Sequence, residues 1–307
     1  MEKVIVVIGP TSVGKTKMGV ALAKKFNGEV ISGDSMQIYK QMDIGTAKVT
    51  EEEKEGIIHH CVDILNPDET YSVHDFQQTV RKKITEITQR GHVPIIVGGT
   101  GLYIKAALYD YQFDEMENDH HAINEKYKDY TNEQLHDHLK SIDEKSAKIL
   151  HFNNRRRVLR AIEIYETTGK RKSEMLEEQE HICLYDAYFV GLTLPRDVLY
   201  ERINKRVDVM MENGLKEEME RLYSQGLTRN HQSMKAIGYK EWFDYYDHQI
   251  DLNDVLELIK KHSRQYAKRQ YTWFKNQFDV HWYDVNLENF EQTIEQVTDD
   301  IEKILKV

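Results

Sequence analysis

One short pattern near the start of the chain restricts the fold more than any other feature. Residues 9–16 read Gly-Pro-Thr-Ser-Val-Gly-Lys-Thr and match the pattern G-x-x-x-x-G-K-[ST]. The apolar run Val4–Ile8 precedes it, and the segment Lys15–Phe26 repeats apolar residues every four positions, as an amphipathic helix does. A strand, a glycine-rich loop and a helix in this order form a phosphate-binding loop. The sequence therefore predicts an α/β fold that binds a pyrophosphate or polyphosphate group.

The residues of this loop have distinct expected roles. Its glycines let backbone N–H groups curl around phosphate oxygens, and the helix N-terminus adds a positive dipole end. Lys15 is expected to neutralise phosphate charge, and the Thr16 hydroxyl is the predicted ligand of a Mg²⁺ ion. The predicted phosphate contacts are Gly9, Pro10, Thr11, Ser12, Val13, Gly14, Lys15 and Thr16.

Further apolar runs alternate with helical stretches, which is typical of a parallel sheet with helices on both faces. The predicted strands are Val4–Ile8, Glu29–Ser32, His60–Ile64, Pro94–Gly98, Tyr188–Leu194 and Val280–Tyr283. The predicted helices of this part are Lys15–Phe26, one from Ser72 to about Arg90, Arg196–Asn213, Leu215–Gln225, one from Asn253 to about Phe278, and one from Glu288 onward.

The pattern changes in the middle of the chain, where residues 113–184 show helical segments and no strand periodicity. Its predicted helices are Thr131 to about Ser141, Glu144–Leu150 and Asn154 to about Thr168. Because strands on both sides need one another to form a sheet, we interpret 113–184 as an all-helical insertion. Residues 1–112 and 185–307 then form the phosphate-loop core.

Composition excludes several classes of protein. The 307 residues carry a formal net charge of −10, which argues against a protein that coats nucleic acid indiscriminately but allows a local basic groove. No apolar run reaches the length of a membrane helix or of a signal-peptide core. Two cysteines make neither a disulfide framework nor a zinc pattern. We expect a cytoplasmic protein, and nothing in the sequence demands more than a monomer.

Two polar positions follow predicted strands. Asp34 comes after Val30–Ser32, and carboxyl ends of parallel strands line the crevice where ligands bind. Its carboxylate could bind Mg²⁺, act as a general base or cap a turn. Thr100 lies within Gly98-Gly-Thr-Gly101, which indicates either a close backbone approach to a ligand or a plain structural turn. The base-reading pattern N-K-x-D of GTPases is missing, since Asn204–Asp208 is one residue too long.

Several motifs, in this order along the chain, resemble the tRNA dimethylallyltransferase family, also called tRNA isopentenyl transferase. The phosphate loop occurs in many families, whereas two motifs are specific for this one: Gly33-Asp-Ser-Met-Gln37 and Arg264-Gln-Tyr-Ala-Lys-Arg-Gln270. The others are Asp43-Ile-Gly-Thr-Ala-Lys48, Val97-Gly-Gly-Thr-Gly-Leu-Tyr103, Arg160-Ala-Ile-Glu-Ile-Tyr165 and Ala236-Ile-Gly-Tyr-Lys-Glu241.

The resemblance implies transfer of a dimethylallyl group from dimethylallyl diphosphate to the exocyclic amine of an adenosine. That adenosine lies immediately 3′ of the anticodon in tRNA, and diphosphate leaves. Asp34 matches the family's general base, Thr100 helps to hold the adenine, and Arg206 matches a lid-like position that stabilises the leaving group. Ser35, Met36 and Gln37 belong to the segment expected against the extruded base and its neighbours. No protein partner is implied.

Two basic stretches fit an RNA partner within this acidic chain. Residues 154–172 include Arg156, Arg157 and Arg160, which share a helical face, although charge runs are usually solvated surfaces. Residues 260–275 interleave cations with aromatic residues, which either stack on bases or form a core face. The predicted tRNA contacts are Asp34, Ser35, Met36, Gln37, Thr100, Arg156, Arg157, Arg160, Arg264, Lys268 and Arg269.

The sequence leaves three alternatives open. A prenyltransferase that acts on free AMP-type nucleotides would perform the same chemistry without the helical insertion and the basic stretches. A small-molecule kinase fits the fold and the phosphate loop equally well, and an RNA-binding module would keep the loop without turnover. Three local features depart from the family pattern. Asp119–Glu125 lacks the arginine usually found near the start of the insertion, Asp143-Glu144 replaces the usual Asp-Pro, and Asn153-Asn154 replaces the usual Asn-Asp.

Overall fold

A computed structural model describes residues 1–111, 120–178 and 181–305 of the chain. The chain divides into two compact units, one formed by residues 1–109 and 183–307 and the other by residues 110–182. The predicted boundary between residues 112 and 113 lies outside the described residues. Among the described helices, none combines the length and the apolar character that a membrane-spanning helix requires.

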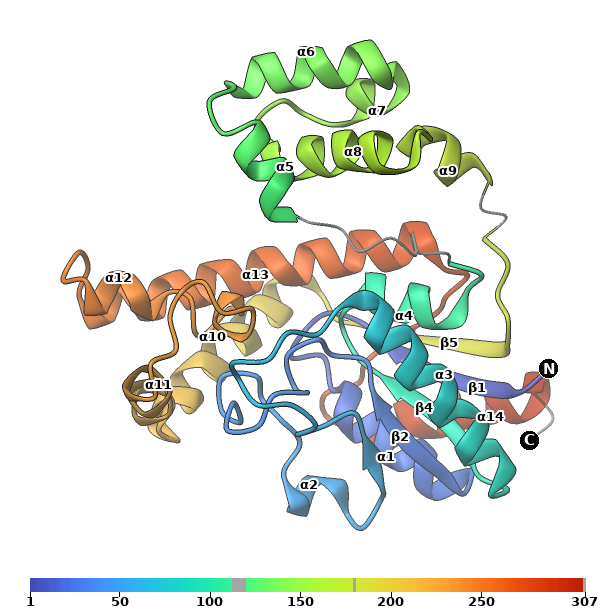
Figure 1. The fold of residues 1–307 in the computed structure, drawn as a ribbon. Coiled ribbons are helices and arrows are strands. Elements are labelled where there is room, and N and C mark those ends of the chain that lie inside the picture. Colours follow the sequence, from blue (N-terminus) through green and yellow to red (C-terminus); the bar gives the residue numbers. More distant parts are fainter. Residues whose placement is uncertain (112–119, 179–180, 306–307) are drawn as a thin grey trace. The chain divides into compact units, whose positions relative to one another are not determined.

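The larger unit contains a six-stranded sheet in the order β3-β2-β4-β1-β5-β6, and every strand pair in it is parallel (Figure 1). This confirms the predicted α/β class. The strands are β1 (Lys3–Ile8), β2 (Gly28–Ser32), β3 (His59–His60), β4 (Val93–Val97), β5 (Asp186–Thr193) and β6 (His281–Asp284).

The predicted strand His60–Ile64 is wrong beyond its first residue. Cys61 and Asp63 adopt positive φ angles of 60° and 55°, a left-handed backbone that no strand accommodates. Instead of pairing with β2, the backbone N–H groups of Ile64 and Leu65 donate to the carbonyl of Ile38. The apolar run therefore packs as a loop beside the sheet.

The longer helices of the larger unit follow the predicted periodicities closely, but the short helices α2, α4 and α12 were not predicted. For α4, the glycine-rich segment Gly98–Gly101 indicated either a close approach to a ligand or a turn, whereas Thr100 is the N-cap of a helix of mostly buried residues. The helices are α1 (Lys15–Lys25), α2 (Glu51–Lys54), α3 (Val73–Gln89), α4 (Gly101–Leu108), α10 (Arg196–Glu212), α11 (Leu215–Ser224), α12 (Trp242–Tyr246), α13 (Leu252–Gln277) and α14 (Phe290–Leu305).

Successive residues of β1 enter two separate hydrophobic cores. Val4, Val6 and Ile8 pack in a cluster with the apolar face of α3, whereas Ile5 and Val7 pack in a cluster with α1 and α14. All five side chains are fully buried. Because a strand buried on both faces reads as a continuous apolar run, this packing explains the sequence pattern and confirms helices on both faces of the sheet.

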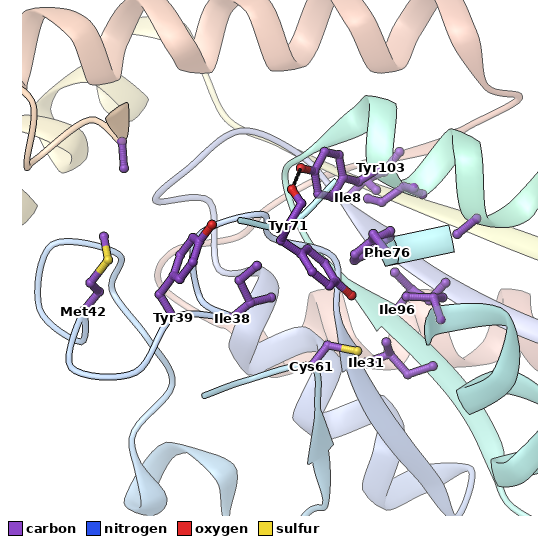
Figure 2. Packing of buried hydrophobic residues seen from close by; sticks show 14 of the residues in the cluster. Ile8, Ile31, Ile38, Tyr39, Met42, Cys61, Tyr71, Phe76, Ile96 and Tyr103 are labelled. Carbon is purple, nitrogen blue, oxygen red and sulfur yellow. Dashed lines mark hydrogen bonds between the residues drawn. The ribbon is translucent and has the colours of Figure 1, made fainter. Parts of the chain in front are cut away.

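Figure 2 shows the cluster on the α3 face of the sheet. The rings of Phe76 in α3 and Tyr103 in α4 have centroids 5.0 Å apart, beside Ile31 and Ile96 of the central strands. The Tyr103 hydroxyl also donates to the Tyr71 carbonyl across 3.3 Å. This packing fixes α4, and it thereby fixes the end of β4 where the site forms.

The smaller unit is helical throughout its described residues. Its core includes Leu135 and Leu139 of one helix and Val158 and Ile162 of another. A buried carboxylate, Asp143, accepts hydrogen bonds from the backbone N–H groups that begin two of the helices. These helices are α5 (His120–Lys126), α6 (Asn132–Ile142), α7 (Glu144–Ile149), α8 (Arg155–Thr168) and α9 (Lys172–Glu178).

Candidate active site

The phosphate loop joins β1 to α1 as the sequence predicts. Gly14 at the start of α1 has φ +106°, and a Cβ there would lie 2.8 Å from the Phe290 ring, so only glycine fits. Ser12 also has a positive φ, and its buried hydroxyl has no hydrogen-bond partner among the described residues. The Lys15 ammonium turns back along the loop and donates to the Pro10 carbonyl across 2.8 Å.

One glutamine of α13 connects this loop to the end of β4. The Gln270 carbonyl Oε1 accepts from the Thr11 N–H at 3.0 Å, and its Nε2 donates to the Gly99 carbonyl at 3.0 Å. A Cβ on Gly99 would lie 2.1 Å from that Nε2, so the glycine permits the approach. Tyr266, one turn earlier on α13, donates to the same carbonyl across 3.3 Å. These residues of the basic stretch therefore support the site from within.

Asp34 and Thr100 are brought together at the ends of the adjacent strands β2 and β4. The Thr100 hydroxyl oxygen accepts from the Ser35 N–H at 3.1 Å, which fixes the two loops to each other. Asp34 Oδ1 accepts from the Met36 N–H at 2.8 Å. The turn-capping role of Asp34 is therefore real, and the same residue lines the adjoining pocket.

Helix α10 places two arginines over the phosphate loop. Arg206 Nη1 donates to the Thr11 hydroxyl at 3.1 Å, and Arg202 Nε donates to the Ser12 carbonyl at 3.0 Å. Burial, together with the Arg206 charge, lowers the pKa of Lys15 to about 7, although Asp34 opposes this shift. Burial also lowers the pKa of Arg206. Two cations thus share a site that lacks enough negative charge, which suits an anionic ligand.

The negative charge of Asp34 also affects Tyr266, an aromatic residue that lines the pocket. Burial, with a smaller contribution from the Asp34 carboxylate, raises the pKa of Tyr266 to about 12, so its hydroxyl stays protonated. A pocket of about 340 Å³ opens between these groups. Its polar part includes Thr11, Ser12, Asp34 and Arg206.

The sequence and the fold are similar to those of known proteins. A family model described as IPP transferase matches residues 37–277. The chain belongs to the IPP transferase family. Proteins of Bacillus cereus and Bacillus anthracis named tRNA dimethylallyltransferase are 54% identical over 287 residues, which is 92% of this chain and 90% and 91% of theirs.

Solved structures of IPP transferases share the fold as well. A tRNA isopentenylpyrophosphate transferase of Staphylococcus epidermidis is 47% identical with a TM-score of 0.74, and it covers 99% of both chains. The Bacillus halodurans protein of that name is 45% identical with a TM-score of 0.75, covering 100% of this chain and 99% of its own. A eukaryotic dimethylallyltransferase acting on tRNA is 33% identical with a TM-score of 0.87, covering 99% of this chain and 79% of its own.

A buried carboxylate that the sequence analysis missed organises the far wall of the IPP transferase pocket. Glu218 of α11, only 2% exposed, accepts from the backbone N–H groups of Asp43, Ile44 and Gly45 at 2.8, 2.9 and 3.0 Å. It also accepts from the Tyr239 hydroxyl at 2.6 Å. Burial, and then the Glu218 charge, raises the pKa of Tyr239 well above its usual value. Glu218 therefore joins two loops that both line the pocket.

Gln37 and Lys48 fix the segment between Asp34 and this wall. Gln37 accepts from the Ser32 hydroxyl at 3.0 Å and donates to the Ala47 carbonyl at 3.2 Å, so both ends of its amide have protein partners. The buried ammonium of Lys48 reaches Asp43 and Asp63, each at 2.6 Å. Met36 lines the pocket and packs against the core.

The predicted RNA contacts lie in different surroundings. On α13, Lys268 is exposed, Arg269 lines the pocket and Arg264 donates to Asn204. On α8 in the smaller unit, Arg156 and Arg157 are exposed. The third predicted contact of that helix, Arg160, pairs with the buried Glu163 at 2.8 Å. The missing-arginine segment Asp119–Glu125 begins outside the described residues.

Proposed function

We propose that this chain transfers a dimethylallyl group from dimethylallyl diphosphate to the exocyclic N6 amine of the adenosine 3′-adjacent to the anticodon in tRNA. One observation carries the proposal: Thr11 and Ser12 of the phosphate loop line a single pocket together with Arg206 and with Asp34 at the end of the neighbouring strand. The acceptor and donor follow the activity named for the close relatives described above.

The residues divide the reaction between them. The bond between C1 of the allyl group and the diphosphate oxygen breaks, and its electron pair leaves with the diphosphate. The loop N–H groups, Lys15 and Arg206 stabilise that charge. A new bond forms between C1 and N6, and Asp34 accepts the proton that N6 loses. Thr100, fixed to the Asp34 loop through Ser35, is placed to orient the adenine.

Oxygen donors suit Mg²⁺, and the Thr16 hydroxyl at the first turn of α1 would hold it together with diphosphate oxygens. Across the described residues, no group of three or more His, Cys, Asp or Glu side chains forms a protein-only metal site. The ion would therefore bind chiefly with the donor, where it adds positive charge at the leaving group.

The smaller unit and α13 supply the candidate tRNA contacts. We infer that Arg156 and Arg157, exposed on α8, hold phosphates of the anticodon stem-loop, and that Arg160 contributes in part. Lys268 and Arg269 on α13 hold phosphates near the pocket. The target adenosine must leave its stack to reach Asp34, which a single-stranded loop permits at modest cost.

Mass spectrometry of RNA tests the function directly. Enzyme, Mg²⁺ and dimethylallyl diphosphate are mixed with unmodified tRNA, with AMP in a parallel reaction. A gain of one C₅H₈ unit on the anticodon-loop adenosine is the expected result. A gain on AMP alone would favour a free-nucleotide prenyltransferase. No gain on either, with consumption of ATP in a third reaction that contains it, would favour a kinase and contradict the proposal.

A further inference from the structure

The pocket is lined by polar groups of the phosphate loop and by apolar side chains further along helix α10. Arg206 contacts the phosphate loop, and Met210 lies one turn further along the same helix, about 6 Å away along its axis. Both side chains line the pocket, with Val207 between them. These three side chains form a stripe along α10. A donor whose diphosphate binds beside Arg206 can lay its hydrocarbon along this stripe.

Helix α13 runs antiparallel beside this stripe. Asn204 accepts from Arg264, and four residues further along α10 Asp208 pairs with Lys260 at 2.8 Å. Since residue numbers fall on α13 as they rise on α10, Ile259 lies near the level of Met210. Ile259 is buried and lines the same pocket.

The loop after the short helix at Ser233–Lys235 supplies the third side. Ala236 and Ile237 line the pocket, and Glu241 holds the loop by accepting from the Gly238 N–H at 2.9 Å and pairing with His262 at 2.6 Å. The loop is therefore fixed against α13 rather than free to yield. Apolar side chains from α10, from α13 and from the loop thus line this part of the pocket, where Lys235 and Lys240 also contribute.

We propose that Met210 and Ile237 close the hydrocarbon subsite and set the length of the donor at one isoprene unit. This inference rests on the proposed function, because it assigns the apolar part of the same pocket to the donor. The diphosphate is held by the phosphate loop and Arg206, so a longer chain cannot retreat toward that end. Its additional carbons would have to occupy the space of these two side chains.

Both residues are suited to a test because they are only half-buried. Truncation therefore extends the pocket without opening a void in the core. The chemistry with a ten-carbon donor is unchanged: the C1–oxygen bond breaks, the C1–N6 bond forms, diphosphate leaves and Asp34 takes the proton. Only the space beyond the first five carbons differs.

The experiment compares dimethylallyl diphosphate with geranyl diphosphate as donors to the same unmodified tRNA. Met210→Ala and Ile237→Ala are measured beside wild type, with Met211→Ala as the matched control. Met211 is the next residue of α10 and packs partly against the core without lining the pocket. We expect the ratio of kcat/KM for the C₁₀ donor to that for the C₅ donor to rise at least about tenfold in either pocket variant and to stay constant in Met211→Ala.

Binding gives a second readout that does not require turnover. The rise in Tm caused by a saturating non-hydrolysable geranyl thiodiphosphate should be larger in the pocket variants than in wild type. An unchanged donor ratio and an unchanged Tm response in both pocket variants would overturn the inference, even though wild type transfers the C₅ group. Failure of wild type to transfer the C₅ group to tRNA would instead overturn the proposed function.

Discussion

The two walls of the pocket are built by different means. The phosphate loop is a local structure, in which eight consecutive residues use their own backbone and one helix N-terminus. The wall at residues 43–45 depends on Glu218, whose partner Gly45 is 173 residues away in the sequence. In the proposed reaction the first wall stabilises the charge of the leaving diphosphate, whereas the second wall holds loops in place. Substitutions beside the first wall should therefore lower the rate of the reaction, whereas substitutions in the second wall should also lower the free energy of unfolding.

The largest effect should follow from replacing Asp34 by asparagine. Asparagine keeps an oxygen that can accept from the Met36 N–H, so the turn is preserved, but it cannot take the proton from N6. We expect kcat to fall about 10²- to 10⁴-fold with tRNA affinity nearly unchanged. Single-turnover kinetics and a binding titration with the same tRNA check both parts. Turnover close to that of wild type would remove Asp34 from the role of base.

Glu218→Gln should have a smaller but broader effect. All four groups around this carboxylate are donors, and an amide presents its own donor to at least one of them. We expect a loss of about 1–3 kcal/mol in the free energy of unfolding and a drop of about tenfold in kcat/KM.

The matched control for Glu218→Gln is Glu220→Gln on the same helix. Glu220 lies at the surface, 3.6 Å from Lys216, and should change stability by no more than about 0.5 kcal/mol. Tyr239→Phe removes a single hydrogen bond, and its loss in the free energy of unfolding should lie between those of the two glutamine variants. Denaturant unfolding and steady-state kinetics measure all three variants. Equal behaviour of the two glutamine variants would show that Glu218 does not hold the wall.

This difference between the walls also explains what the sequence could reveal. The phosphate loop, Asp34 and Thr100 follow strands within three residues, so strand periodicity and motif spacing were enough to place them. Glu218 carries no motif, and only its position on the apolar face with Leu215, Met219 and Leu222 could have marked it. A carboxylate at such a position must find partners, but the sequence does not say which.

The errors in secondary structure have a similar cause. The predicted strand at His60–Ile64 has the composition of a strand, but a left-handed backbone at Cys61 and Asp63 ends it. The apolar composition of a segment does not determine the φ angles of its residues. Helix α4 was missed because glycines at its first position and just before it have low helix propensity, which packing of Tyr103 against Phe76 overrides. Both features depend on contacts with distant residues.

A more modest effect is expected from the exposed arginines of the smaller unit. In Arg156→Ala/Arg157→Ala, tRNA affinity should weaken and the slope of log K against log salt should flatten by about 1.5, because two phosphate contacts no longer release counterions. Arg160 is left intact, since its removal would leave the buried Glu163 without this partner. Lys145→Ala/Lys148→Ala, which removes two surface cations of the same unit, is the control. An unchanged slope in the arginine variant would assign those residues to the solvated surface.

The smallest effect concerns pH and acts on the phosphate wall alone. The pKa of Lys15 is lowered to about 7, so the charged ammonium prevails below this pH and is lost above it. A diphosphate ligand favours the charged form, and donor affinity should therefore weaken as pH rises, by about twofold at pH 7 relative to full protonation.

Between the lowered pKa and the ordinary value of 10.5, the unfolded chain binds more protons at this residue, so the Lys15 contribution to stability rises with pH.

Calorimetry with inorganic pyrophosphate from pH 6 to pH 8 measures the affinity, and proton uptake follows from buffers of different ionisation enthalpy. Because pyrophosphate also titrates in this range, the informative quantity is the difference between wild type and Lys15→Arg, whose side chain stays charged. Wild type should lose more affinity across this range than the arginine variant. Parallel profiles would mean that Lys15 keeps its proton throughout, and that Asp34 and the surrounding dipoles offset the effects of burial and of Arg206 at this wall.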